Sequence, residues 1–101
     1  MTVRVRIGKE VRDLKEVDES WVNQRINRMR SDQLEPCVQV TFDEPDARFT
    51  LSTPSCVGGG AGLGRPVSAK ERGLLELWNK LHLGTDTFAS GNLIAFLKQA
   101  G

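Results

Sequence analysis

Cys37, Cys56 and His82 are the residues of this chain best suited to nucleophilic or metal chemistry. The chain has no other cysteine or histidine. A structural zinc site needs four such ligands, so one chain cannot complete it alone. A catalytic cysteine needs a neighbouring base, and His82 is the only candidate. His82 also lies at the end of a predicted helix, where a cation is favourable, and this accounts for its presence. We therefore expect no metal site, no cofactor and no enzymatic activity.

The two cysteines flank a predicted β-hairpin. In the register given below they lie on the same side of it, diagonally offset by about two residues. Diagonal neighbours are about 7–8 Å apart, at or beyond the reach of a disulfide, although a bend at Pro54 could close the gap. Disulfides are also rare in a reducing cytoplasm. We predict two free thiols, while the sequence leaves open whether Cys37 and Cys56 are ever oxidised.

A glycine-rich stretch is the second feature that could bind a ligand. Five of the seven residues from 58 to 64 are glycine. Gly59 and Gly64 have the spacing of a phosphate-binding loop, but Arg65 and Pro66 stand where that loop needs a lysine and a hydroxyl. We interpret residues 58–66 as a linker, and whether a ligand orders it stays open.

Arginines form two groups that could contact phosphates. The chain carries 14 basic and 13 acidic residues, a net charge of +1, so no overall field attracts nucleic acid. It has no tyrosine, and its four phenylalanines belong to apolar patterns, so bases would have no exposed aromatic ring on which to stack. A small nucleic-acid-binding regulator is therefore the alternative hypothesis. Its candidate residues are Arg25, Arg28 and Arg30 on a helix, and Arg4, Arg6 and Arg48 on the sheet.

Apolar residues recur with the period of strands in the first half of the chain and with the period of helices in the second. The predicted elements are a strand over 3–7, a helix from Asp18 or Ser20 to about Ser31, a hairpin with strands around 38–42 and 48–52, a helix over 68–83, and a helix from about 87–90 to 100. Ser68 and Glu71 form a capping box, and Gly84 is placed to end the helix before it. Residues 9–17 could form a short helical turn or a second strand edge.

The predicted hairpin has a definite register, because residues directly opposite each other share a face. The expected pairs are Phe42 with Phe49, Val40 with Leu51, and Asp43 with Arg48.

Together these elements predict a single α+β domain. It consists of a β-α-β-β part over 1–57, the linker over 58–66 and an α-α hairpin over 67–101. We expect a small antiparallel or mixed sheet of three strands, covered by helices on one face. A chain of 101 residues is long enough to bury such a core.

The helical hairpin carries more apolar side chains than one small sheet face can cover, which favours a binding surface. We predict a non-catalytic interaction or adaptor domain that binds a protein partner or self-associates. No apolar run approaches the length of a membrane span, and the N-terminal residues lack the apolar core of a secretory signal, so we expect a cytoplasmic protein that does not enter membranes. The candidate contact residues are Leu74, Leu77, Trp78, Leu81, Phe88 and Phe96.

Overall fold

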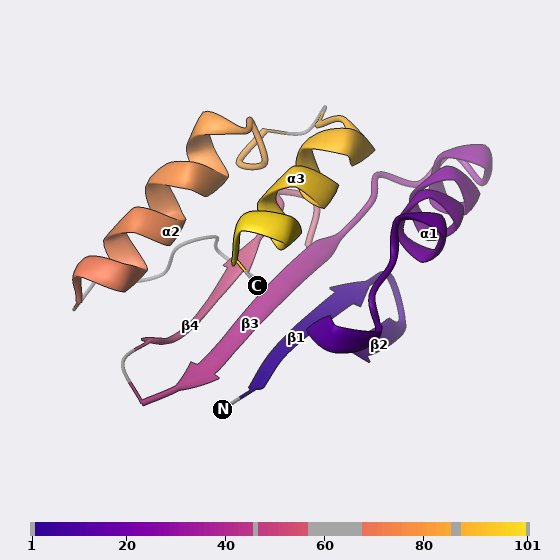
Figure 1. Ribbon diagram of the computed structural model, residues 1–101. Coiled ribbons are helices and arrows are strands. Elements are labelled where there is room, and N and C mark those ends of the chain that lie inside the picture. Colours follow the sequence, from indigo (N-terminus) through magenta and orange to yellow (C-terminus); the bar gives the residue numbers. More distant parts are fainter. Residues whose placement is uncertain (1, 46, 57–67, 86–87, 101) are drawn as a thin grey trace.

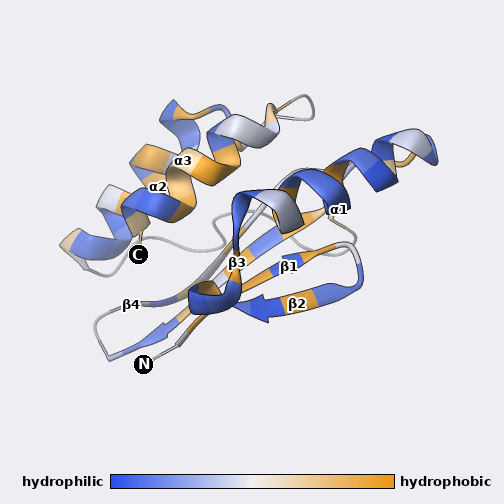
Figure 2. Cartoon of the chain, turned by 45° about the vertical axis from the view of Figure 1, so that its right-hand side comes forward, coloured by the Kyte–Doolittle hydropathy of each residue, from blue (hydrophilic) through white to orange (hydrophobic). Residues whose placement is uncertain are grey.

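The structure is a computed structural model that describes residues 2–45, 47–56, 68–85 and 88–100. In chain order its elements are β1 (Thr2–Ile7), β2 (Glu10–Asp13), the 3-10 helix η1 (Leu14–Glu16), α1 (Glu19–Ser31), β3 (Val38–Glu44), β4 (Ala47–Ser52), α2 (Ala69–Lys80) and α3 (Ser90–Ala100). The strands form one antiparallel sheet in the order β2-β1-β3-β4. All three α-helices lie on the same side of this sheet (Figures 1 and 2). The predicted α+β class is confirmed.

The predicted hairpin is confirmed together with its register. β3 and β4 pair as expected, and the side chains of Asp43 and Arg48 form an ion pair with 3.6 Å between Oδ1 and Nε. On the same outer face, the hydroxyl oxygens of Thr41 and Thr50 lie 3.1 Å apart. The alternation of apolar and polar residues was sufficient to fix this pairing, because a slip of one residue would turn every apolar side chain outward.

The prediction of three strands was wrong, since the described residues form four. Residues 9–17 hold both structures that the sequence left open, the edge strand β2 followed by the one-turn helix η1. Gly8, with a φ of +65°, makes the tight turn from β1 into β2. No residue of β2 is fully buried, so this strand lacks the apolar alternation by which the others were found.

Helices α1 and α2 end in the same way, with a residue other than glycine in the left-handed conformation. Gln33 has a φ of +60° and His82 a φ of +61°. After α2, the Leu83 N–H donates to the Trp78 carbonyl and the His82 N–H donates to the Asn79 carbonyl, each at 3.0 Å. This pattern is a Schellman motif. The prediction that Gly84 ends this helix was wrong, because burial of Leu83 places the turn two residues earlier.

Replacing His82 with glycine should raise the free energy of unfolding by about 0.5–1 kcal/mol, because glycine adopts positive φ without the steric penalty of a side chain. His82→Ala keeps that penalty and is the matched control. Urea unfolding followed by circular dichroism measures both. The assignment of strain to His82 would be contradicted if the glycine variant were no more stable than the alanine variant.

One core joins the sheet to all three helices. At its centre is a chain of aromatic contacts from the sheet to α2. Phe49 stacks on Phe42 with 5.0 Å between ring centroids, Phe42 meets Phe96 edge-on at 6.5 Å, and Phe96 meets Trp78 edge-on at 5.1 Å. The C-terminal helices are therefore packed onto the sheet through Phe96 of α3.

Cys37 and Cys56 are joined in a disulfide, with their Cα atoms 4.7 Å apart, so the prediction of free thiols was wrong. The chain folds back just after β4. There, the Thr53 N–H donates to the Val38 carbonyl at 2.9 Å, and the Cys56 N–H donates to the Thr53 carbonyl at 3.1 Å. The buried hydroxyl of Thr53 fixes this bend further, since it accepts from the Val38 N–H at 2.9 Å and donates to the Pro36 carbonyl at 3.2 Å. The bend closes the diagonal gap that a straight hairpin would leave.

Candidate functional site

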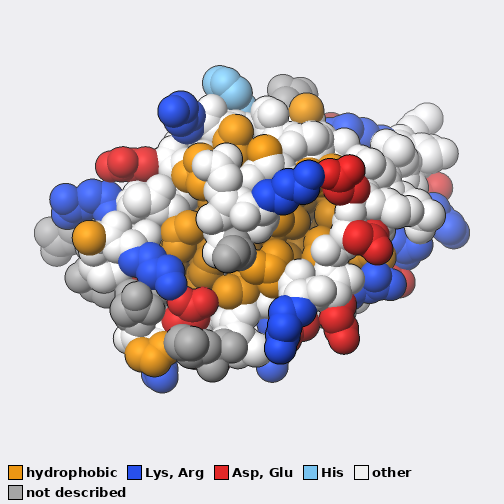
Figure 3. Space-filling model, in the orientation of Figure 1, with side chains coloured by type: hydrophobic (Ala, Val, Ile, Leu, Met, Phe, Trp, Pro, Cys, Tyr) orange, Lys and Arg blue, Asp and Glu red, His pale blue; other side chains and the backbone are white. Residues whose placement is uncertain are grey.

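A groove of about 770 Å³ opens on the helical side of the molecule. It lies between η1, the first turn of α1 and the second half of α3, over the start of β1. Figure 3 shows this hollow as an apolar area framed by charged side chains. Its volume is within the range of sites that bind ligands or side chains of a partner.

The apolar lining of the groove has two levels. Val3, Val22 and Leu97 are buried and belong to the core, so they form the floor. The walls are half-buried apolar side chains from η1, from the residue after it and from α3. These wall residues are Leu14, Val17, Ile94 and Ala100. The walls are therefore the apolar surface that a bound group would cover.

Charged side chains surround this apolar lining. Glu19 of α1 and Lys98 of α3 form an ion pair, with 2.6 Å between Oε1 and Nζ, that connects the two helices at the rim. Asp18 caps α1, because its carboxylate accepts from the Trp21 N–H at 2.7 Å. Asp13 caps η1 in the same manner. Both aspartates are thus held in place by the helices that they begin.

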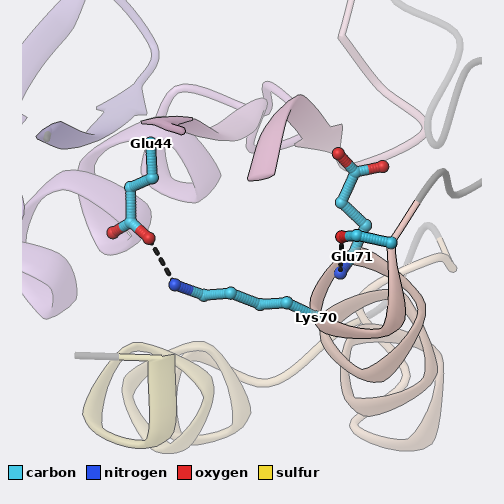
Figure 4. A network of polar contacts seen from close by, with 4 residues as sticks. Glu44, Lys70 and Glu71 are labelled. Carbon is cyan, nitrogen blue, oxygen red and sulfur yellow. Dashed lines mark hydrogen bonds and ion pairs between the residues drawn. The ribbon is translucent and has the colours of Figure 1, made fainter. Parts of the chain in front are cut away.

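A second ion pair, between Glu44 and Lys70, connects the rim to α2 (Figure 4). Glu44 lies at the end of β3, and Lys70 lies in the first turn of α2. Next to Lys70, the Glu71 N–H donates to the Ser68 hydroxyl at 3.2 Å, which confirms Ser68 as the predicted cap. The ion pair joins the start of α2 to the sheet, and the cap satisfies a backbone N–H of the first turn of this helix.

The six contact residues predicted on the helical hairpin do not form one surface. Trp78, Phe88 and Phe96 are 1%, 3% and 0% exposed, so they belong to the core and offer no area to a partner. The remaining three, Leu74, Leu77 and Leu81, are half-buried and pack against that core. None of the six lines the groove, which α3 borders instead with Ile94, Leu97, Lys98 and Ala100.

The arginines of α1 mostly make contacts within the protein. Arg25 pairs with Glu10 of β2 at 3.1 Å. Arg30 donates to the Phe88 carbonyl at 2.5 Å, and its guanidinium lies 5.6 Å from the centroid of the Phe88 ring. Arg28 is exposed and has no ion pair with any described residue. These contacts position α1, and they leave one of its three arginines for a ligand.

The sheet arginines lie on the face away from the helices. Arg4 is directly opposite Asp13 on β2, and Arg48 pairs with Asp43. The Arg6 Nε–H donates to the carbonyl of Gly8 at 2.9 Å. The Asp13 carboxylate caps η1 and lines the groove, so Asp43 is the carboxylate that pairs with a sheet arginine on this face.

The described residues contain no group of three or more His, Cys, Asp or Glu side chains that could hold a metal ion. Across the same ranges, no helix is long and apolar enough to cross a membrane. The linker predicted over 58–66 lies outside the residues that the structure describes.

Known family models, curated protein sequences and solved structures give no match to this chain.

Proposed function

We propose that this protein is a non-catalytic interaction domain that binds a partner protein in the groove between α3 and the start of α1. The observation that carries the proposal is the half-buried apolar wall formed by Leu14, Val17, Ile94 and Ala100. Apolar surface left in contact with water in one concave patch is typical of interaction sites. The helical hairpin still supplies the binding surface, but through the side of α3 that faces α1.

The arrangement of the lining favours a protein over a small metabolite. An apolar centre surrounded by charged groups is the usual anatomy of a protein interface. Here the apolar floor and walls are surrounded by Lys15, Glu19 and Lys98, all exposed, and by three further carboxylates. Such a rim can form hydrogen bonds to a partner while the apolar walls are covered.

The lining also supports a non-catalytic role. Its described residues include neither a histidine nor a cysteine nor a hydroxyl side chain. Asp13 and Asp18 act as helix caps, and Glu19 and Glu44 are in ion pairs. The acidic groups at the rim therefore already have structural partners, and no nucleophile accompanies them.

The alternative function, nucleic-acid binding, has less support. Arg6, Arg25 and Arg30 each bind another group of the protein, and Arg48 pairs with Asp43. Arg4 and Arg28 are exposed and have no ion pair or side-chain hydrogen bond to a described residue, and they lie on different faces. A scattered set of this kind provides little of the charge density that phosphate binding needs.

Replacing Ile94 with glutamine should reduce the partner captured from a native lysate about tenfold. Glutamine keeps the helix propensity and removes an apolar side chain whose burial contributes about 1.5–3 kcal/mol. The tagged protein is used as bait, with mass spectrometry as the readout and with nuclease in a parallel sample. A partner lost only after nuclease treatment would instead support the nucleic-acid alternative.

Leu34→Gln is the matched control for this experiment. Leu34 is 56% exposed and follows the C-terminal end of α1, whereas the groove lies at the N-terminal end of that helix, about 20 Å away. The control should capture the partner at the wild-type level. Equal capture by wild type and both variants would show that the groove does not bind the partner.

A further inference from the structure

The rim of the groove carries more negative than positive charge. Its described lining includes two lysines, Lys15 and Lys98, and twice as many carboxylates. These carboxylates are Asp13, Asp18, Glu19 and Glu44. Lys70 of α2 pairs with Glu44, so three lysines stand against four carboxylates, and the groove keeps a small excess of acid although the chain as a whole has a net charge of +1.

The ends of two helices affect the same charge balance. α3 ends at Ala100, which lines the groove, and the last carbonyls of a helix carry partial negative charge. The N-terminus of α1 carries partial positive charge, but Asp18 caps it and Glu19 lies in its first turn. Full negative charges therefore offset the positive end of α1, as Lys98 in the last turn of α3 offsets the negative end of that helix, so the side-chain charges set the balance.

The ion pair at the rim is able to change partners. Glu19 and Lys98 retain 59% and 68% of their side-chain exposure, and exposed ion pairs contribute little to stability. A lysine or arginine of a bound chain can therefore take the place of Lys98 beside Glu19. The protein would lose little by this exchange.

We propose that the partner presents a basic amphipathic segment, with large apolar residues that enter the groove and with lysine or arginine residues that contact its rim. This inference rests on the proposed function and adds the chemistry of the partner. The apolar residues would cover Ile94, Val17 and Leu14, while the basic residues would meet the exposed carboxylates of Glu19 and Asp18. Apolar anchors and charge complementarity would thus act together in selecting the partner.

The test uses three fluorescent peptides of equal length and the full chain, with binding followed by anisotropy. One peptide contains leucine and lysine in an amphipathic pattern, the second has glutamate in place of lysine, and the third has serine in place of leucine. The leucine–lysine peptide should bind at least tenfold more tightly than either of the other two. Its affinity should fall as salt is raised, because the charges at the rim are exposed.

A charge reversal at the rim should weaken this binding selectively. Glu19→Lys should reduce the affinity for the leucine–lysine peptide about tenfold. Glu35→Lys makes the same change in net charge at an exposed position beyond the far end of α1, and it should change the affinity less than twofold at physiological salt. Circular dichroism establishes that both variants are folded.

The outcomes separate this inference from the proposed function. Equal binding of the leucine–lysine and leucine–glutamate peptides, reduced in both cases by Ile94→Gln, would overturn the basic partner and leave the groove as the binding site. Binding of the serine–lysine peptide as tightly as the leucine–lysine peptide would overturn the need for apolar anchors. If no peptide binds while Ile94→Gln still abolishes capture from lysate, the inference is wrong and the proposed function stands.

Discussion

The Trp78→Ala variant should unfold with a free energy about 3–5 kcal/mol lower than that of the wild-type protein, the usual effect of truncating a buried large aromatic residue. Trp78 is 1% exposed, and its ring meets Phe96 at 5.1 Å. Removal of the indole would break the aromatic chain that connects α2 through α3 to the sheet. Urea unfolding followed by circular dichroism measures the change.

Two variants control for this result. Trp78→Phe keeps an aromatic ring and removes an indole N–H that has no hydrogen-bond partner, so it should destabilise the protein much less than alanine does. Leu77→Ala, at the half-buried neighbouring position, should also have a smaller effect than Trp78→Ala. A Trp78→Ala variant as stable as wild type would contradict the core position of Trp78 and restore it as a residue available for binding.

Reducing the disulfide between Cys37 and Cys56 should lower the free energy of unfolding by about 3 kcal/mol. The two cysteines are 19 positions apart in the sequence. Opening a loop of this length raises the conformational entropy of the unfolded chain, which lowers the free energy of that state by about 3 kcal/mol. Urea unfolding with and without a reductant measures the effect.

The double variant Cys37→Ser, Cys56→Ser is the control, because its stability should match that of the reduced wild-type protein and should not respond to reductant. If reductant leaves the wild-type unfolding curve unchanged, the bond is absent or does not constrain the unfolded chain. The bend at Thr53 would then depend on its hydrogen bonds alone.

Much of the fold could be predicted because several segments have patterns that depend on near neighbours only. The alternation in β3 and β4 determined their register, and Ser68 followed by Glu71 marked the start of α2. In each case the free energy that selects the structure comes from residues close in sequence or directly opposite in a hairpin. Local patterns are therefore informative there.

The features that were missed depend on tertiary structure. β2 is an exposed edge strand with no buried residue, so its sequence does not alternate between apolar and polar residues. The disulfide depends on a bend that the buried Thr53 hydroxyl fixes by hydrogen bonds to Val38 and Pro36. His82 ends α2 because burial of Leu83 outweighs the preference for glycine at positive φ.

The groove was missed for a related reason. Its floor and walls come from three segments that are distant in sequence, represented by Val3, Val17 and Ile94. The sequence indicated an excess of apolar residues in the C-terminal helices, but it could not tell which of them the core covers. Only the packing of α3 between α1 and α2 distinguishes buried Phe96 from half-buried Ile94.

The central claim, that the groove is the binding surface, is tested most directly by site-specific photo-crosslinking in native lysate. Benzoylphenylalanine is placed at Lys98, on the rim of the groove, or at Lys80, an exposed lysine at the end of α2 that does not line the groove. We predict that irradiation joins the partner to the protein labelled at position 98 and not to the protein labelled at position 80. The reverse pattern, or equal crosslinking from both positions, would contradict the assignment of the groove.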